Sequence, residues 1–223
     1  DKNLRKIKLF LPSLSEQQRI VAKLDATYAE IDKTINNTKK IISSHKDFLN
    51  SILEDFFNSK DNKLFKKKEL GEIIEVLTDY HANGSYKKLK DNITLKNEKD
   101  YAWMVRSTDF EKNFKNDLRY INKNSYNYLS KSKIFGGEII MSKIGNAGKI
   151  YLVPKLSMPA SLAMNLFLIR IKNKLAIDKY VFFYLSSRGG KNQIHSRIKG
   201  ATTQTITKEN VRNIKIPICS MEN

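Results

Sequence analysis

Three stretches of the sequence combine cationic side chains with amide and hydroxyl side chains, the two kinds of group that contact nucleic acid. Lysine and arginine bind phosphate oxygens, whereas asparagine, glutamine, serine and threonine can hydrogen-bond to base edges. The stretches span residues 80–90, 142–149 and 187–204. The candidate nucleic-acid-binding residues are Asn83, Ser85, Tyr86, Lys87, Lys143, Asn146, Lys149, Arg188, Lys191, Gln193, Arg197, Lys199, Thr202, Thr203 and Gln204.

For any one of these residues a solvated surface position is the simpler interpretation. For the stretch 187–204 as a whole, contact with DNA is the favoured hypothesis, because it holds the most candidates. The two glycines of 142–149 would also let the backbone approach a phosphate closely. Trp103 could stack on a base, but a tryptophan in an alternating strand is more often part of the core.

The distribution of charge favours a polyanionic partner. The chain has 41 Lys and Arg residues against 23 Asp and Glu residues, a net charge of +18. Basic and acidic residues balance within residues 15–60, so the excess lies mainly in residues 61–223. A lysine-rich proteome would also raise the total, but it would not leave one segment neutral. We therefore expect nucleic acid to bind to the part after residue 60.

Several catalytic chemistries are not supported by the residues. Gly145–Lys149 resembles the end of a P-loop, but Ile150 replaces the hydroxyl residue that would bind magnesium. No glycine-rich cofactor motif opens a helix after a strand, and no close pair of carboxylates is evident in residues 101–223. One cysteine and three scattered histidines favour neither a disulfide nor a zinc site. We expect no catalysis, metal or cofactor in this chain.

The element that must position these stretches is a long helix over residues 14–57. Its apolar residues follow the steps of three and four that are typical of a coiled coil, over more than four heptads. Thr38 and His45 interrupt the pattern, either to set the register or as tolerated defects. A helix of about 65 Å is too long for this chain to cover, so we expect a second long helix to pair with it. The helix-pairing residues are Leu24, Tyr28, Ile31, Ile35, Ile42, Leu49, Ile52 and Phe56.

The remaining patterns predict an α+β protein, with the coiled-coil-forming helix followed by a mixed α/β domain. Short strands are expected at 101–105, 138–141, 149–153 and 166–171, and residues 80–97 are expected to form a loop or hairpin. Asp178–Ser187 predicts an amphipathic helix with Asp178 as its N-cap, and Ser15 with Gln18 predicts a capping box for the long helix. Phe183, with Tyr151, Phe167 and Phe182, is assigned to the core.

The domain organisation follows from these elements and from a short repeat. Residues 3–9 match residues 210–216 in identity or apolar type at all but one position. We therefore expect residues 1–14 to be the end of a preceding domain, 15–60 the helix and 61–223 the DNA-binding domain. No apolar run is long enough to cross a membrane and the N-terminus is no signal peptide, so a cytoplasmic location is expected.

The order of several motifs resembles the specificity subunits of type I restriction-modification systems. In that family a target-recognition domain ends in a proline-containing phrase before a Glu-Gln pair, and then passes into a long helix. Residues 7–20 resemble this junction, and Leu70–Glu72, Gly136–Ser142 and Ile198–Thr202 follow in the expected order. The sequence departs from the pattern at Phe10, where the first family proline is expected, and it stops at Asn223, where a second helix should begin.

The resemblance implies a non-catalytic DNA-specificity module. Family members carry two recognition domains separated by two antiparallel helices. Each domain reads half of a split target on double-stranded DNA, and the helices dock the methyltransferase subunit. This chain would be the C-terminal half of such a subunit, an excised fragment, or a half-length subunit that dimerises. S-adenosylmethionine, ATP and magnesium would belong to the methyltransferase and restriction subunits. The alternative hypothesis is a coiled-coil assembly protein whose basic domain binds nucleic acid without sequence preference.

Overall fold

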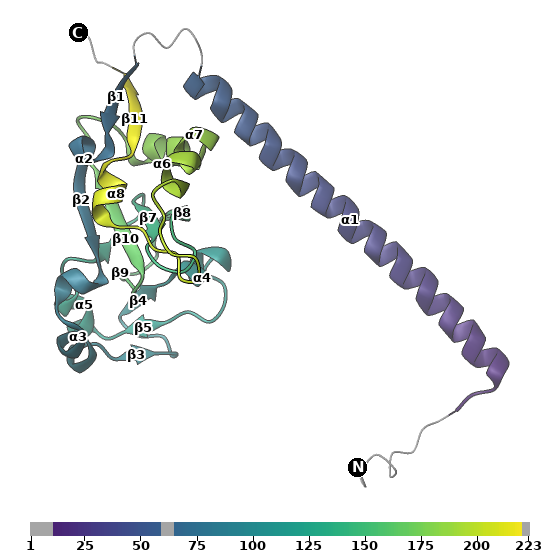
Figure 1. Cartoon of the computed structure of the whole chain (residues 1–223). Helices are drawn as coiled ribbons and strands as arrows, with labels where there is room; N and C mark the ends of the chain where they lie inside the picture. The colour runs from purple at the N-terminus through teal and green to yellow at the C-terminus, as the bar shows by residue number, and fades with distance from the viewer. Residues whose placement is uncertain (1–10, 59–64, 220–223) are drawn as a thin grey trace. The chain divides into compact units, whose positions relative to one another are not determined.

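The computed structural model describes residues 11–58 and 65–219 (Figure 1). The predicted repeat copy at residues 3–9, and with it most of the predicted segment 1–14, lies outside the described residues. The chain divides into two compact units, residues 1–51 and residues 52–223, which are described separately.

Helix α1 spans Leu14–Asn58, which confirms the predicted long helix. Its N-terminus is capped by Ser13, whose hydroxyl accepts a hydrogen bond from the amide of Glu16 at 3.3 Å. The predicted capping box of Ser15 and Gln18 is therefore wrong, because the helix begins one residue before Ser15. Gln17 instead donates its side-chain amide to the carbonyl of Pro12 at 2.8 Å.

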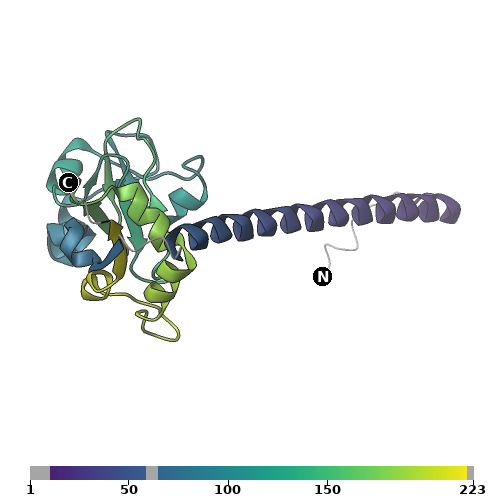
Figure 2. The same cartoon turned by 90° about the horizontal axis from the view of Figure 1, so that it is seen from above.

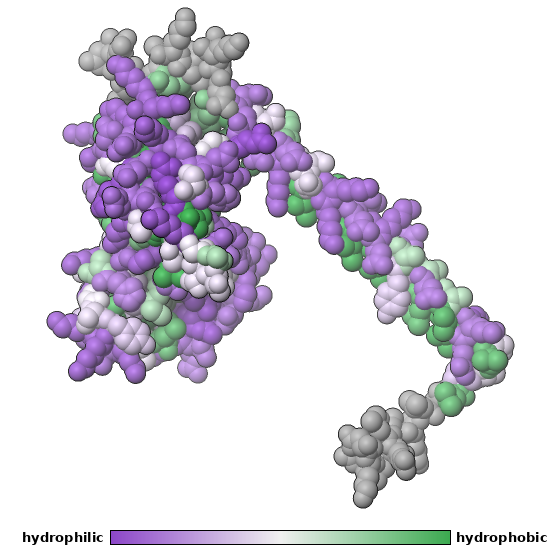
Figure 3. Space-filling view, viewed as in Figure 1, coloured by the Kyte–Doolittle hydropathy of each residue, from purple (hydrophilic) through white to green (hydrophobic). Residues whose placement is uncertain are grey.

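The eight predicted helix-pairing residues are 44% to 62% exposed in this chain. Figure 3 shows apolar side chains running along the long helix among polar ones. The last turn of α1 belongs to the second unit, where Leu53 is buried. There Phe57 makes edge-on ring contacts with Tyr180 and Tyr184, with centroids 5.7 Å and 5.1 Å apart.

The second unit is built around two sheets and a separate strand pair. A four-stranded antiparallel sheet has the order β2-β10-β7-β8, and a five-stranded sheet has the order β3-β5-β4-β9-β6 with β4 and β9 parallel. The first sheet consists of β2 (Ile74–Asp79), β10 (Leu166–Ile171), β7 (Ile139–Ser142) and β8 (Ile150–Leu152). The second consists of β3 (Leu95–Lys96), β5 (Tyr120–Ile121), β4 (Ala102–Val105), β9 (Ala160–Leu162) and β6 (Lys133–Ile134). The pair is β1 (Phe65–Glu69) with β11 (Lys215–Cys219).

Strand alternation divides the apolar residues among three cores. In β7, Ile139 and Met141 belong to one core while Ile140 belongs to the next, since successive side chains point to opposite faces of a sheet. In β4, Met104 and Val105 divide in the same way between the second core and a third. The second core therefore lies between the two sheets. Each fully buried isoleucine or leucine in these layers stabilises the fold by about 1.5–3 kcal/mol.

Helices cover the outer faces of the two sheets. The first core is closed by α2 (Leu70–Ile73), α6 (Asp178–Ser186), α7 (Arg188–His195) and α8 (Lys208–Arg212), and the third by η3 (Tyr80–Asn83), α3 (Tyr86–Asn92) and α5 (Lys123–Tyr128). Helix α4 (Ser107–Glu111) follows β4. In Figures 1 and 2, α6 and α7 lie beside each other, and α6 also contacts β7 and β8. The α+β class and the mixed domain after the long helix are confirmed.

Three local predictions differ from the structure. Residues 80–97 form η3, α3 and β3 rather than a loop or hairpin, because Ser85 caps α3 and Leu89 is buried. Asp178 lies inside α6, whose N-cap is Ile177, and its carboxylate accepts the amide hydrogen of Ile171 at 3.1 Å. Phe183 is 38% exposed, since it lies opposite the buried face of α6.

Candidate nucleic-acid interface

The loop between β7 and β8 carries the second stretch of candidate residues and lies against α7. Gly145 and Gly148 have φ angles of 85° and 81°, which favour glycine. A Cβ atom at Gly148 would lie 2.3 Å from Cγ2 of Ile194. Glycine at this position therefore allows the loop to approach the buried side chain of Ile194 on α7.

A hairpin over residues 199–205 carries the end of the third stretch. Lys199 and Thr205 exchange backbone hydrogen bonds of 2.9 Å and 2.8 Å. Two further bonds tie the hairpin to the β7–β8 loop, from the amide of Gly145 to the carbonyl of Gln204 (3.0 Å) and from the amide of Ile206 to the carbonyl of Lys143 (3.1 Å). Backbone hydrogen bonding therefore brings the second and third stretches together.

Helix α7 supplies the third side of the site. Its N-cap Ser187 accepts the amide hydrogen of Gly190 at 3.2 Å, and a Cβ at Gly190 would lie 2.2 Å from the carbonyl oxygen of Tyr184. This close approach seats α7 on α6 and turns Lys191 and His195 toward the loop. Together they form an open groove of about 570 Å³, lined by Asn146, Ala147, Gly148, Lys149, Ile150, Leu185, Ser186, Lys191, His195 and Gln204.

Most polar side chains of the groove and the hairpin are available to a ligand. Within residues 11–58 and 65–219, they are exposed and their side chains make no hydrogen bond or ion pair. Such groups can bind phosphate or base edges without first breaking an internal bond. This set comprises Asn146, Lys191, Lys199, Thr202, Thr203 and Gln204, and Arg188 at the start of α7 shares these properties.

Gln193 and Arg197 are engaged inside the protein. The Gln193 side chain donates to the Tyr184 hydroxyl and to the carbonyl of Lys215, both at 2.8 Å, and accepts the Lys215 amide at 2.9 Å. The guanidinium of Arg197 donates to the carbonyls of Gln193 (2.8 Å) and Asn213 (2.9 Å). These bonds join α7 to β11, so both side chains hold the scaffold of the groove.

Lys143 lies beneath the loop in an ion pair with a buried carboxylate. Its ammonium is 3.0 Å from Asp79, and Lys208 lies 3.4 Å from the other oxygen of the same carboxylate. Burial alone would raise the pKa of Asp79, but the two ammonium groups outweigh it, and the pKa lies below its usual value. The trio links the end of β2, the start of the β7–β8 loop and α8.

Lys149 is paired at the surface with Glu111 of α4. Its ammonium lies 2.7 Å from the Glu111 carboxylate, which also accepts a hydrogen bond from the Tyr151 hydroxyl at 3.2 Å. The Lys149 ammonium lowers the pKa of Glu111, and the carboxylate raises the pKa of Lys149. An exposed pair of this kind is weak, so a phosphate could replace Glu111.

The first stretch is separate from the groove in its contacts. Asn83 donates to Tyr80 and Ser132 and accepts the Lys131 amide at 2.9 Å, which fixes η3 against the β6 side of the domain. Ser85 caps α3, while Tyr86 and Lys87 are exposed on that helix. No hydrogen bond or ion pair in the described part of the chain joins residues 83–87 to the groove.

Several polar groups at the site were not among the predicted residues, including His195, Glu111, Asp79 and Lys208. His195 follows Lys191 by four positions, so a search for residues on one face of a helix would have found it. Glu111 and Lys208 are brought to Lys149 and Asp79 by tertiary folding. No local sequence signal marks either pairing, because the partners lie 38 and more than 100 residues apart.

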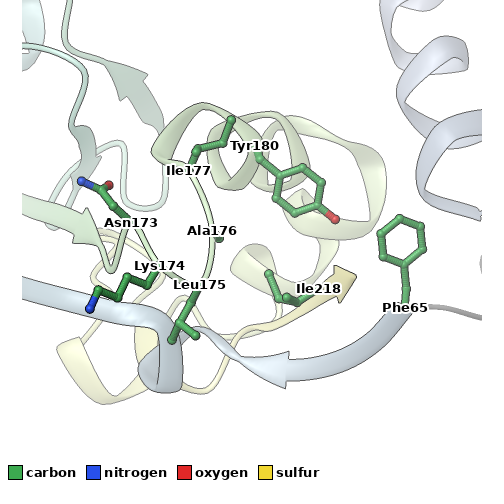
Figure 4. A pocket seen from close by; sticks show the side chains of 8 residues that line it. All are labelled: Phe65, Asn173, Lys174, Leu175, Ala176, Ile177, Tyr180 and Ile218. Carbon is green, nitrogen blue, oxygen red and sulfur yellow. The ribbon is translucent and has the colours of Figure 1, made fainter. Parts of the chain in front are cut away.

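A second cavity, of about 320 Å³, has a different character (Figure 4). It lies between the 173–177 loop, α6 and the β1–β11 pair, and Figure 4 shows the Lys174 ammonium pointing away from Tyr180. Its walls are mainly apolar, so it lacks the converging polar groups of the groove. The lining residues are Phe65, Asn173, Lys174, Leu175, Ala176, Ile177, Tyr180 and Ile218.

The described part of the chain holds neither a cluster of metal ligands nor a membrane-spanning helix. Among residues 11–58 and 65–219, no three His, Cys, Asp or Glu side chains are close enough together to hold a metal ion. No helix there is both long enough and apolar enough to span a bilayer.

Comparisons with known proteins give one consistent result. A family model described as "Type I restriction modification DNA specificity domain" matches residues 50–223. Two similar proteins from Methanocaldococcus jannaschii are the type I restriction enzyme MjaVIII specificity subunit, 23% identical over 97% of this chain, and the putative type I restriction enzyme MjaX specificity subunit, 27% identical over 98%. The chain spans about half the length of these relatives, 52% and 50%. A solved structure of a type I R-M system, 15% identical, has the same fold, with a TM-score of 0.56 over 95% of this chain and 49% of the other.

Proposed function

The chain belongs to the family of type I restriction-modification DNA specificity domains, as its motifs predicted, and from this premise we propose that it reads one half of a bipartite DNA target. The unit over residues 52–223 would bind one half-site on double-stranded DNA. The subunit would act without catalysis of its own, and the methyltransferase and restriction subunits would carry S-adenosylmethionine, ATP and magnesium. The site of action would be the cytoplasm.

The observation that carries this proposal is the groove between the β7–β8 loop, α7 and the 199–205 hairpin. It presents Lys191 beside the amide groups of Asn146 and Gln204, all three exposed. Cationic groups bind phosphates and set the orientation of a protein on DNA, whereas amides can discriminate between base edges. The groove therefore combines the two functions that sequence-specific binding requires.

Binding should be driven largely by electrostatics. The net charge of +18 attracts a polyanion, and each phosphate neutralised by a lysine or arginine releases counterions from the DNA. Affinity should therefore fall as salt concentration rises. Gln204 and the threonines at the hairpin tip would add the sequence-dependent part of the free energy of binding.

Helix α1 would bind the protein partners. Its exposed apolar residues fit a second long helix, contributed by the rest of a longer subunit or by another copy of the chain, and the pair would dock the methyltransferase. Burial of alternating a and d residues between two helices would remove this apolar surface from water. Residues 15–60 would then act as the spacer, and residues 61–223 as the recognition domain.

The proposal is tested by methylation mapping. The full chain is combined with the methyltransferase subunit of its restriction-modification system and S-adenosylmethionine on plasmid DNA, and methylated bases are located by sequencing. We expect methylation at one recurrent motif, only when this chain is present. Association with the methyltransferase but methylation without any motif would contradict the proposal and favour a non-specific basic assembly protein.

Two substitutions in the groove should separate phosphate binding from base reading. Lys191→Ala should weaken binding to all duplexes alike and reduce the slope of log K against log salt by about 0.9. Gln204→Ala should weaken binding to the mapped motif by about 1–3 kcal/mol and leave binding to unrelated duplexes unchanged. Fluorescence anisotropy at several salt concentrations measures both effects.

Lys179→Ala provides the matched control, because this exposed lysine of α6 lines a different, apolar pocket. If Lys179→Ala reduced the salt slope as much as Lys191→Ala, the groove would not be the phosphate-binding site.

A further inference from the structure

The connection between β9 and β10 presents an apolar side chain at its tip. Residues 163–165 pass from the five-stranded sheet to the four-stranded sheet. Ala163 is buried and its amide donates to the carbonyl of Val105 at 2.9 Å, whereas Met164 is 50% exposed. Asn165 has a φ angle of 65°, a left-handed conformation that asparagine tolerates better than most residues. The turn is therefore tight and holds Met164 at the surface.

This turn lies beside the loop and the hairpin that form the groove. Lys143 connects them, since its amide donates to the carbonyl of Asn165 at 2.8 Å and its carbonyl accepts the amide hydrogen of Ile206 at 3.1 Å. The register of β10 with β7 pairs Leu166 with Ser142. This pair is the last of the ladder, and the turn over residues 163–165 directly precedes it in the chain.

Ile144 in turn pairs with Thr205 of the hairpin. Backbone pairing through Lys143 and Ile144 therefore places the turn, the start of the loop and the base of the hairpin next to one another. Lys143, which joins the turn to the hairpin, is also the lysine that pairs with Asp79 in the trio with Lys208.

A single exposed methionine is ordinary on a protein surface. Met164 differs because it lies on a turn that is fixed beside a polar groove. Backbone hydrogen bonds fix its turn on both sides, and the loop to which the turn is bonded lines a groove with amide and ammonium groups. The major groove of DNA offers one apolar group among its donors and acceptors, the C5-methyl group of thymine. Methionine is flexible and polarisable, so it can adapt to such a contact.

We propose that Met164 contacts the C5-methyl group of a thymine in the half-site, next to the bases that face the 199–205 hairpin. This inference rests on the proposed function and adds a specificity-determining residue to it. Met164 would favour thymine over cytosine at one position, because cytosine lacks the C5-methyl group. The amide groups of the groove would recognise hydrogen-bonding groups on the bases instead.

The test replaces thymine by deoxyuridine, which lacks only the methyl group. The full chain, assembled with its methyltransferase, is titrated against duplexes that carry the mapped motif with each thymine replaced in turn. At one position the wild type should bind the deoxyuridine duplex about fourfold more weakly, the effect expected for one buried methyl group. Met164→Ala should lose that difference, and Met164→Leu should retain most of it.

The outcomes distinguish this inference from the function on which it rests. If no motif is bound or methylated, the proposed function fails. If a motif is bound but the wild type ignores deoxyuridine at every position, only the contact by Met164 is overturned. The same conclusion follows if Met164→Ala weakens binding equally to thymine and deoxyuridine duplexes, because the side chain would then act without reading the methyl group.

Discussion

Lys143, Lys149 and Lys191 carry the same charge in different surroundings. Lys143 is held by the buried Asp79, Lys149 by the exposed Glu111, and Lys191 has no ion pair within the described residues. A phosphate can approach Lys191 at no internal cost, and it can displace the weak pair of Lys149. For Lys143 it would have to compete with a carboxylate that has little access to water. We therefore expect the three lysines to contribute to binding in the order Lys191, Lys149, Lys143.

The buried carboxylate allows a prediction about pH. The pKa of Asp79 is lowered in the folded protein, so its ionisation stabilises the fold above its usual pKa of about 3.9, and this stability is lost as pH falls through the lower, folded value. Asp79→Asn should reduce the free energy of unfolding by about 1–3 kcal/mol at pH 7. The difference from wild type should shrink as pH falls below about 4, as measured by urea denaturation at a series of pH values.

Asp91→Asn is the matched control, since Asp91 is exposed on α3. A difference between wild type and Asp79→Asn that stayed constant down to pH 2 would show that the ion-paired trio does not stabilise the fold through its charge.

At the residue scale, the sequence predicted which types of residue lie at the site. It could not predict which of their side chains are available to bind DNA. Gln193 and Arg197 are residue types that often contact bases, yet their side chains donate hydrogen bonds within the protein. Gln193 donates to the Tyr184 hydroxyl and the Lys215 carbonyl, and Arg197 donates to the Asn213 carbonyl. Those partners lie up to 22 residues away in sequence. Which polar side chains remain available depends on tertiary contacts, so it cannot be read from local composition.

At the scale of elements, the β7–β8 loop depends on its two glycines for different reasons. Both have positive φ angles, but a Cβ at Gly145 would meet nothing within 4 Å, whereas one at Gly148 would collide with Ile194. Gly145→Ala therefore measures backbone strain alone. Gly148→Ala should cost about 1–3 kcal/mol more, because it also overpacks the contact with α7.

The collision can be relieved by a second substitution. Ile194→Leu moves the branch point of the side chain away from Cβ and removes Cγ2, and it should cost less than about 1.5 kcal/mol by itself. Gly148→Ala should then be less destabilising in the Ile194→Leu background than in the wild type, as measured by thermal unfolding. Simple additivity of the two substitutions would contradict this account of the loop.

The longer elements were predictable and the shorter ones were not. Strand β10 is buried on both faces, so its sequence is an almost continuous apolar run. Helix α1 repeats its spacing of apolar residues over many turns. Helix α3 has only 7 residues and buries Leu89 alone, so its periodicity is too weak to distinguish it from a loop. The hairpin at 199–205 is held by backbone hydrogen bonds to a loop more than 50 residues earlier, which no local pattern reveals.

At the scale of the whole molecule, the exposed apolar residues of α1 predict association. Ile35→Asp places a charge in the middle of the predicted seam and should weaken association, with another copy or with the methyltransferase, by at least about tenfold, since a buried unpaired charge is strongly unfavourable. Analytical ultracentrifugation over a range of concentrations measures this effect. The melting temperature of the domain over residues 65–219 should not change.

Asn36→Asp adds the same side chain at the neighbouring position, outside the seam, and serves as the control. Equal association of the two variants would show that the predicted a and d residues do not form the contact.

The first and last strands of the recognition domain are hydrogen-bonded neighbours. Phe65 pairs with Cys219 and Glu69 with Lys215, so the chain enters and leaves the domain at one place. An exchange of DNA between related genes that replaced everything between these strands would have two crossover points in the gene but one junction in the folded protein. Recombination of the whole domain would then transfer a target specificity in a single step.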